Sequence, residues 1–380
     1  MKKVGMITMH QVWNAGSALQ AYALQYIIET LGYEAKLIDY KYPNLEHAAF
    51  SNNIKEVCSL NFKGALKVLF YIVRSYFVKS SHRRAYTNFY ERYFKRTDLE
   101  YVSRKSLLEN PPQFDIYVTG SDQVWNPQYV GFDTSYLLDF VPEHAKRLSY
   151  ASSFSTNNIP SYMHDDYARC LIKYDNISVR EQSGKRIVEG LIHKNATVCC
   201  DPTLLLDDKQ WGNLACESIF KVSRKYILVY IMGYAYNPYP MIYQHIDSVS
   251  KKLKLPVLFY NTRRGKYKAP YGEIKVDGLG PLEFLWLFQN AAFVVTDSFH
   301  GTAFSLNFKR PFISVIEKKD GSDSRVYNLL ETTGTQHRAI LCSKPTIHDE
   351  VYQELTTTNE GRLNELRRNS KKYLQDALKF

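Results

Sequence analysis

The chain has 380 residues, a formal net charge of +11 and a hydrophobic content of 45%. This length suits two globular domains, and the composition excludes a disordered or fibrous protein. The six cysteines include no CxxC pair, so we expect neither a zinc site nor a disulfide framework. No apolar window reaches the length of a membrane span, and residues 1–9 lack the features of a signal peptide. We therefore expect a cytoplasmic protein.

The N-terminal residues predict a strand, a polar turn and a helix. Val4–Met9 is an apolar run, and Ser17–Leu31 has helical periodicity. At the junction, Gly16 permits close backbone approach, while Asn14 and Ser17 can bind a ligand or cap the helix. The junction is not GxGxxG, so dinucleotide binding is not supported. A binding turn and a simple capped turn both fit this pattern.

Phe62–Arg96 accounts for most of the net positive charge of the chain, +8 of +11. It contains nine Lys or Arg against one acid, and ten Phe or Tyr lie between them. Such a segment suits the surface of an anionic membrane, and single-stranded nucleic acid is the competing partner. A helical hairpin packed on the first domain is the alternative without a partner. We expect peripheral contact with the inner face of the cytoplasmic membrane and no nucleic acid.

Two polar motifs follow predicted strands in the middle of the chain. The first, GSDQVWNP, follows Phe114–Thr119 and predicts a sugar-binding loop, because carboxylates and amides bind hydroxyls and an indole stacks on the C–H face of a sugar. Its candidate residues are Asp122, Gln123, Trp125 and Asn126. A capped turn over a core Trp is the alternative.

The second motif follows the strand-like run Asn176–Val179. It begins with Arg180, which is well placed to bind a carboxylate or phosphate through two hydrogen bonds. A surface ion pair between Arg180 and Glu181 is the alternative.

A second series of strands occupies the C-terminal half, and its clearest unit is Phe293–Pro311. This stretch reads as a buried strand, a polar turn and a helix, followed by another strand. Ligands of such units bind beyond the carboxyl end of the strand, where the first helical amides favour an anion. His300 lies in that turn. In the alternative reading, Asp297 or Ser298 only caps the helix and His300 is a structural residue.

Five segments together resemble the polysaccharide pyruvyl transferase family. They are WNAGSALQAYAL, GSDQVWNP, ISVREQSG, CDPTLLL and TDSFHGTAFSL, in this order along nearly the whole chain. The resemblance implies an α/β fold with two Rossmann-like domains facing a cleft, as in GT-B enzymes. It also implies phosphoenolpyruvate as donor, with no metal or other cofactor. The implied acceptor is a sugar of a bacterial surface polysaccharide or of its lipid-linked oligosaccharide precursor, on which a pyruvate ketal forms.

The resemblance assigns roles to several residues. His300 matches the catalytic histidine of the family, with Asp122 or Asp297 assisting at the sugar hydroxyls. Arg180 matches a donor-binding arginine, and Ser298, Phe299 and Gly301 share the donor turn. Characterised members often carry arginine where this chain has Ser298. The missing charge would be replaced by Arg325, or by Arg263 and Arg264.

The expected domains are residues 1–205 on the acceptor side, with a basic aromatic helical insertion at 62–104, and residues 206–345 on the donor side. Asn14, Gly16, Ser17, Gln123, Trp125 and Asn126 would bind the acceptor. Residues 346–380 are expected to form a helix that packs across both domains. Two alternatives stay open: a GT-B glycosyltransferase that uses a nucleotide sugar, and a catalytically silent glycan- or membrane-binding protein.

Overall fold

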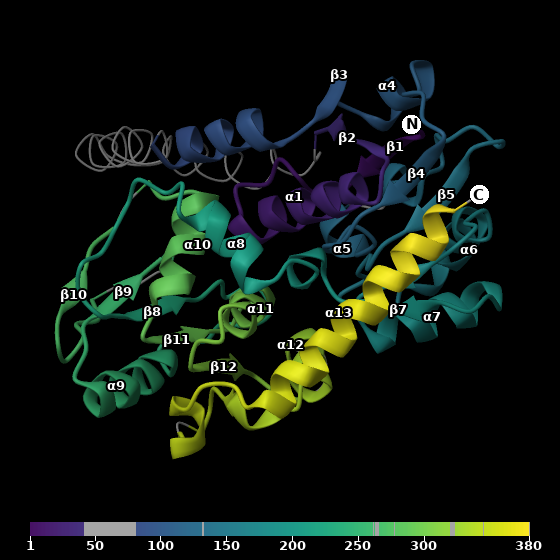
Figure 1. Cartoon of the computed structure of the whole chain (residues 1–380). Helices are drawn as coiled ribbons and strands as arrows, with labels where there is room; N and C mark the ends of the chain where they lie inside the picture. The colour runs from purple at the N-terminus through teal and green to yellow at the C-terminus, as the bar shows by residue number, and fades with distance from the viewer. Residues whose placement is uncertain are drawn as a thin grey trace, which may run out of the picture.

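The structure is a computed structural model that describes residues 1–41, 81–130, 133–260, 262, 266–276, 278–319, 324–344 and 346–379. Within these residues the chain forms two parallel sheets, which lie toward opposite ends of the molecule (Figure 1). The predicted α/β class is therefore confirmed.

The first sheet has the strand order β3-β2-β1-β4-β5, and every neighbouring pair is parallel. Its strands are β1 (Lys3–Ile7), β2 (Glu34–Tyr40), β3 (Arg96–Tyr101), β4 (Ile116–Thr119) and β5 (Lys146–Ser149). The associated helices are α1 (Ala15–Thr30), α4 (Arg104–Glu109), α5 (Pro127–Val130), η2 (Thr134–Leu137), η3 (Ser161–Met163), α6 (His164–Leu171) and α7 (Gln182–Ile192). A short parallel pair, β6 (Ser178–Val179) and β7 (Thr197–Val198), continues this part of the chain through isolated bridges beside β5.

The second sheet has the order β10-β9-β8-β11-β12-β13 and is also parallel. Its strands are β8 (Ile227–Tyr230), β9 (Val257–Phe259), β10 (Glu273–Ile274), β11 (Phe293–Thr296), β12 (Phe312–Ile316) and β13 (Ala339–Leu341). The helices of this part are η4 (Pro202–Leu204), α8 (Asp208–Ala215), α9 (Ile242–Leu253), α10 (Pro281–Asn290), α11 (Phe299–Asn307), α12 (Ser324–Thr332), η6 (Gln336–Arg338) and η7 (Asp349–Tyr352). Strands that are buried on both faces suit the apolar, β-branched runs seen in the sequence.

One hydrophobic core joins the two parts. Trp211 of α8 is fully buried between Tyr22 of α1 and Phe304 of α11, with ring centroids 6.0 and 5.2 Å away. The indole N–H donates to the Thr203 carbonyl at 2.9 Å, so the polar group of the buried ring has a hydrogen-bond partner. Helix α1, which follows β1 of the first sheet, and helix α11, which follows β11 of the second, therefore pack against the same aromatic side chain.

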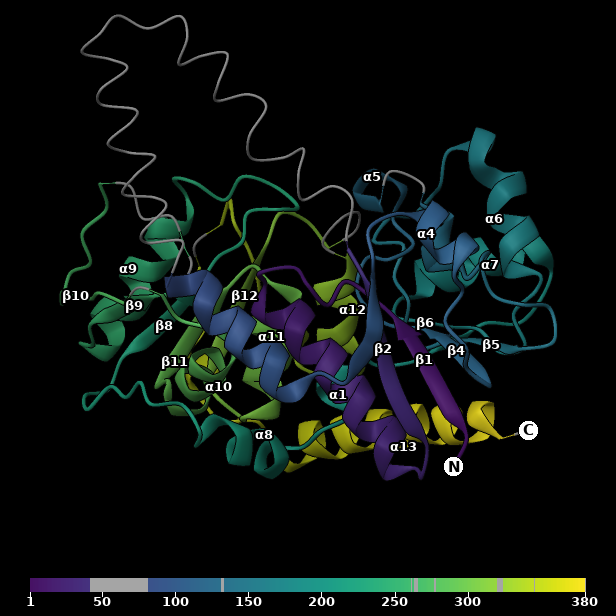
Figure 2. The same cartoon turned by 90° about the horizontal axis from the view of Figure 1, so that it is seen from above.

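The last helix, α13 (Thr357–Leu378), crosses both parts, as Figures 1 and 2 show in yellow. Near its start, Asn359 donates to the Thr333 carbonyl at 3.1 Å, on the side of the second sheet. Further along, the Ser370 hydroxyl accepts from Cys200 N at 2.9 Å, and Tyr373 donates to the Ser149 carbonyl at 3.1 Å. The helix thus contacts elements of both sheets, while the predicted domain boundaries stay a prediction.

Part of the basic aromatic segment is described. Its residues 62–80 lie outside the described part, and residues 81–93 are helical. Four aromatic side chains of the described part are buried and belong to the shared core: Tyr86, Phe89, Tyr90 and Phe94. Packing therefore explains these four aromatic residues, and the predicted membrane contact stays a prediction.

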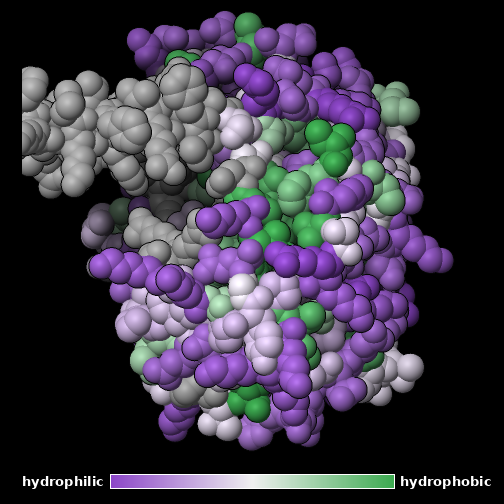
Figure 3. Space-filling model, turned by 90° about the vertical axis from the view of Figure 1, so that its left-hand side faces the viewer, coloured by the Kyte–Doolittle hydropathy of each residue, from purple (hydrophilic) through white to green (hydrophobic). Residues whose placement is uncertain are grey.

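Two observations concern the surface. No helix within the described residues is long and apolar enough to cross a membrane. On the face shown in Figure 3, hydrophilic side chains cover most of the coloured surface.

Candidate active site

The turn between β11 and α11 presents His300. Ser298 is the N-cap of α11, and its hydroxyl accepts from Gly301 N at 3.3 Å. Gly301 must be a glycine because a Cβ there would lie 2.2 Å from the Thr296 hydroxyl oxygen. The close approach of the helix to its own strand fixes His300 in the first helical turn.

The imidazole of His300 lies between two distant parts of the chain. A Cβ added to Gly16 in α1 would lie 2.0 Å from His300 Nδ1, so the first turn of α1 contacts the ring directly. On the other side, Nε2 is 3.7 Å from Asp201 Oδ2, an ion-pair contact that is too long for a hydrogen bond. Only 8% of His300 is exposed. The predicted strand-to-helix junctions of the two halves therefore meet at this histidine.

Asp201, just before η4, anchors the centre of the site. Its carboxylate accepts from Arg180 Nη1 at 2.8 Å, from the Ser121 hydroxyl at 2.9 Å and from Thr203 N at 3.0 Å. Burial by itself would raise the pKa of Asp201, but His300, Arg180 and the Thr203 amide outweigh it and hold this pKa well below its usual range. Asp201 is therefore a carboxylate that holds Arg180 in place beside His300.

Arg180 follows β6 and is 7% exposed. Its guanidinium lies over the Phe299 ring, 4.5 Å from the centroid. Burial would lower its pKa, but Asp201, Glu181 and Asp122 together raise it, so the group is a permanent cation. Its Nε and Nη2 atoms are buried and, like His300 Nε2, make no hydrogen bond within the described residues. The Nε–Nη2 edge is the geometry with which arginine binds a carboxylate or phosphate.

Glu181 lies beside that edge without forming a hydrogen bond to it. Its Oε2 atom is 3.9 Å from Arg180 Nε. The other oxygen, Oε1, accepts from the Ser153 hydroxyl at 2.8 Å and from Ser155 N at 3.0 Å. The alternative of an Arg180–Glu181 pair is confirmed as an ion-pair contact, but the pair is buried and does not lie on the surface.

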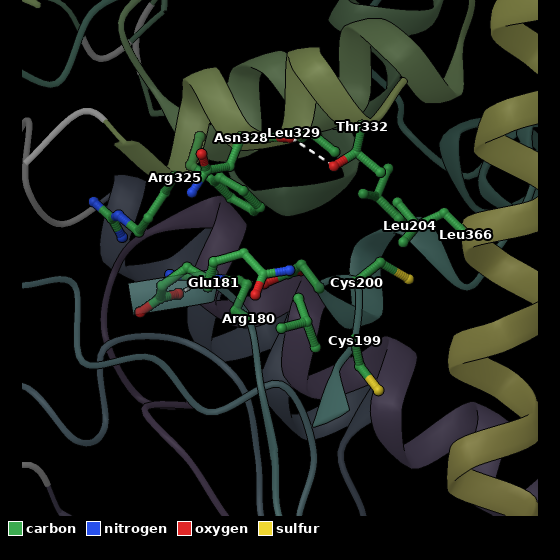
Figure 4. Close-up of a pocket in the computed structure, with 14 residues that line it drawn as sticks. Arg180, Glu181, Cys199, Cys200, Leu204, Arg325, Asn328, Leu329, Thr332 and Leu366 are labelled. Carbon is green, nitrogen blue, oxygen red and sulfur yellow. Dashed lines mark hydrogen bonds and ion pairs between the residues drawn. The ribbon is translucent and has the colours of Figure 1, made fainter. Parts of the chain in front are cut away.

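Arg180 and Glu181 line a pocket of about 70 Å³. In Figure 4, Arg180, Glu181, Cys199 and Cys200 lie on one side, while Arg325, Asn328, Leu329 and Thr332 of α12 lie on the other. Phe299 and Asp201 also line it. The structure thus brings together three predicted donor residues, Arg180, Phe299 and Arg325. Arg263 and Arg264 lie outside the described residues.

The predicted acceptor side adjoins the histidine through α1. Asn14 is the N-cap of this helix and accepts from Ser17 N at 3.2 Å. The Ser17 hydroxyl donates to Asp122 Oδ2 at 2.5 Å. Asp122 has a φ of 76°, a left-handed backbone conformation that is uncommon for a residue with a side chain. The strained turn directs its carboxylate toward Ser17, the residue that follows Gly16 in α1.

Three predicted site residues have structural contacts instead. Trp125 is fully buried, packs beside Phe154 and donates from its indole nitrogen to the Tyr136 carbonyl at 2.9 Å, so no ring face is open to a sugar. Asn126 is also buried, and its Oδ1 accepts from Gln128 N at 2.9 Å.

Asp297 is the third of these residues. Its carboxylate oxygens accept from Met232 N at 2.7 Å and from Gly233 N at 2.8 Å. It therefore fixes the loop that follows β8, and its role as a base is not supported. Gln123 keeps a half-buried side chain, to which the Asn126 amide donates at 3.4 Å.

Asp201 is the central residue that sequence reasoning missed. It lies in the CDPTLLL segment, which reads as the end of a domain. Its position before Pro202 and after a short strand is the available signal, since an Asp there can cap the following turn. Within the described residues there is no group of three or more His, Cys, Asp or Glu side chains that could hold a metal ion.

Comparisons with known proteins identify the fold. UDP-N-acetylglucosamine 2-epimerase from Rickettsia bellii matches with a TM-score of 0.52 at 11% sequence identity, over 98% of this chain and 95% of that chain. UDP-GlcNAc 2-epimerase from Neisseria meningitidis, bound to UDP-GlcNAc, matches with a TM-score of 0.52 at 9% identity, over 98% and 94%. At these identities the likeness concerns the fold alone, and it confirms the predicted GT-B-like arrangement of two Rossmann-like domains.

Sequence comparisons identify one family. A comparison with curated proteins finds no significant match. The family model described as polysaccharide pyruvyl transferase matches residues 14–318. The matched range contains His300, Arg180 and Asp201, and it also contains the first turn of α1.

Proposed function

Because this chain belongs to the polysaccharide pyruvyl transferase family, we propose that it transfers pyruvate from phosphoenolpyruvate to a sugar and forms a ketal. The proposed acceptor is a sugar of a bacterial surface polysaccharide or of its lipid-linked precursor. One observation carries the proposal: Nε and Nη2 of Arg180, which lines the pocket, and Nε2 of His300, which also contacts Asp201, are buried and make no hydrogen bond within the described residues. Buried polar groups are normally paired, so these donors favour an anionic ligand.

Phosphoenolpyruvate carries a carboxylate and a phosphate, and the pocket has a cation on each side. Arg180 would bind one anionic group through its Nε–Nη2 edge. Arg325, across the pocket on α12, would bind the other and replace the charge absent at Ser298. Asp201 holds Arg180 through Nη1, and Glu181 Oε2 lies 3.9 Å from Nε, too far for a hydrogen bond.

The proposed reaction needs one proton donor and two proton acceptors. Protonation of the methylene carbon makes the neighbouring carbon electrophilic, and one sugar hydroxyl adds there and loses its proton. Phosphate then leaves, and the second hydroxyl adds and loses its proton. The sugar hydroxyls lose two protons in total. The methylene carbon gains one as it becomes a methyl group, and the released phosphate gains the other. His300 suits both directions of transfer because an imidazole donates a proton in its charged form and accepts one in its neutral form.

The acceptor would approach from the side of α1. The carboxylate of Asp122 is directed to Ser17, next to the helical turn that contacts His300. We propose Asp122 as the group that receives a hydrogen bond from one sugar hydroxyl, with Asn14, Gly16 and Ser17 forming the adjacent surface. The remaining polar candidate, Gln123, follows Asp122 in the same turn.

The test is release of inorganic phosphate from phosphoenolpyruvate that depends on added sugar, with a matching mass increase of the sugar. In His300→Gln we expect kcat to fall by about 10² to 10⁴, the usual contribution of general acid–base catalysis, with an unchanged circular dichroism spectrum. His337→Gln, in η6, is the matched control. A His300→Gln variant that keeps more than about a tenth of the rate contradicts this role. Sugar-dependent loss of UDP from a nucleotide sugar would favour the glycosyltransferase alternative instead.

We also propose that the reaction needs no metal or other cofactor. In this proposal Arg180 and Arg325 neutralise the negative charges of phosphoenolpyruvate, and His300 supplies the proton. We therefore expect the rate of phosphate release to be unchanged by EDTA. A loss of rate that Mg²⁺ restores would contradict this expectation.

A further inference from the structure

The loop between β1 and α1 is held at nearly every residue. Its first residue, Thr8, donates from its hydroxyl to the Ser121 carbonyl at 2.8 Å. His10 Nε2 lies 3.2 Å from Asp39 Oδ1, and the Val12 carbonyl accepts from the Tyr90 hydroxyl at 2.8 Å. Asn14 ends the loop as the cap of α1. The backbone that carries residue 13 is therefore fixed from both sides.

The ring on this fixed loop is exposed to solvent. Trp13 is 41% exposed, whereas the other three tryptophans, Trp125, Trp211 and Trp286, are at most 9% exposed. Burial of an aromatic ring is a large favourable contribution to stability, so an exposed Trp on a rigid loop does not serve the core.

Arg83 and His82 hold Trp13 in its position. The Arg83 guanidinium lies over the indole, 4.5 Å from the ring centroid, which is a cation–π contact. His82 interacts with the backbone of Trp13, and its Nδ1 lies 2.8 Å from the Leu279 carbonyl in the second half of the chain. The ring is thus oriented by a helix that also contacts the opposite half.

Trp13 is close in sequence to the residue of α1 that contacts His300. Three residues later, Gly16 contacts the His300 ring. A ligand that rests on Trp13 can therefore extend toward His300 along the first turn of α1. The C–H face of a pyranose is an apolar, flat surface that matches an indole, while its hydroxyls reach polar groups such as Ser17 and Asp122.

We propose that Trp13 is the platform on which a pyranose ring of the acceptor stacks, and that Arg83 is the positioning residue that holds this platform. This inference rests on the proposed function and names the contact that selects a sugar ring. It also replaces the stacking role predicted for Trp125, whose ring is buried.

A binding experiment tests the platform without any reaction. Trp13 is the exposed tryptophan, so acrylamide should quench its fluorescence selectively. Methyl β-D-glucopyranoside, methyl β-D-galactopyranoside and methyl β-D-mannopyranoside are the probes, added without phosphoenolpyruvate. We expect at least one of them to reduce quenching in the parent protein and none to change it in Trp13→Phe. If none of these sugars protects Trp13, the inference is wrong, whatever the transfer assay gives.

A kinetic experiment separates stacking from a structural role. We expect Trp13→Ala to raise the KM for the acceptor by about tenfold, with the KM for phosphoenolpyruvate unchanged, and Trp13→Phe to restore part of the loss. Tyr162→Ala is the matched control, since Tyr162 is an exposed aromatic residue on η3. An equal rise in both KM values, or an unchanged acceptor KM, overturns the inference. If a sugar protects Trp13 but never causes phosphate release, the proposed function fails and the sugar site stands.

Discussion

Arg180 divides its guanidinium between two tasks. Nη1 donates to Asp201, whereas Nε and Nη2 make no hydrogen bond within the described residues and form the proposed donor-binding edge. A lysine would keep the charge opposite Asp201, but its single ammonium group cannot offer two parallel N–H donors.

We therefore expect Arg180→Lys to raise the KM for phosphoenolpyruvate while the fold survives. The lost hydrogen bond to a charged group is worth about 1.5–3 kcal/mol, or roughly tenfold to 150-fold in affinity. Steady-state kinetics at saturating acceptor would measure this change. Arg169→Lys, an exposed residue of α6, is the control. An unchanged KM in Arg180→Lys would assign donor binding to another cation.

At the residue scale, the sequence predicts the positions that follow strands but not the direction of every side chain. His300 and Arg180 could be predicted because strand-to-helix turns place them at the carboxyl ends of parallel strands. Trp125 could not be distinguished from Trp13, because the difference is made by Phe154 and Tyr174, which pack on Trp125 from later in the chain. Asp201 was missed for the same reason, since its partners Arg180, Ser121 and His300 come from three separate segments.

At the scale of elements, α1 and α11 approach each other very closely in the site. Gly16 leaves no room for a side chain because a Cβ would lie within 2.0 Å of the His300 ring. An added methyl group must displace the imidazole or separate the two helices.

We expect Gly16→Ala to reduce kcat about as strongly as loss of the histidine, by 10² or more, because a displaced imidazole cannot transfer protons. Gly190→Ala is the matched control: Gly190 lies in α7, and no atom approaches its added Cβ within 4 Å. This control should keep full activity and gain about 0.5–1 kcal/mol of stability. Full activity in Gly16→Ala would show that the helices can separate at no cost to catalysis.

The alternation of strands and helices could be predicted from periodicity, but strand order could not. β1 pairs with β2 and also with β4, which begins more than a hundred residues later in the chain. The aromatic residues of 81–94 present the same difficulty. Their composition fits a membrane, a nucleic acid or a core, and only the packed structure shows Tyr86 and Phe89 in the core.

At the scale of the whole molecule, buried histidines make stability depend on pH. His245 of α9 is buried, its Nε2 lies 3.0 Å from the Cys342 carbonyl, and burial lowers its pKa from the ordinary value of 6.5. Near pH 6 the unfolded chain therefore binds a proton that the folded protein does not, so stability falls as the pH is lowered through about 6.5.

We expect His245→Gln to keep a hydrogen-bond donor for the Cys342 carbonyl while removing the titratable imidazole. The free energy of unfolding, measured in urea between about pH 5 and pH 7, should depend less on pH in this variant than in the parent. Some dependence should remain, because burial also lowers the pKa of His82 and His337. An identical pH dependence in both proteins would show that His245 is not a main contributor.

The contacts of α13 have a consequence for the order in which the chain folds during synthesis. Tyr373 reaches Ser149 across 224 residues, and Tyr33 donates to the Leu378 carbonyl across 345 residues. A ribosome releases the first half of the chain long before this helix exists, so the surface around Ser149, Cys200 and Leu204 has to wait uncovered. Contacts of such high sequence separation also slow folding. The nascent N-terminal half is therefore most prone to aggregation before α13 has been synthesised and covers this surface.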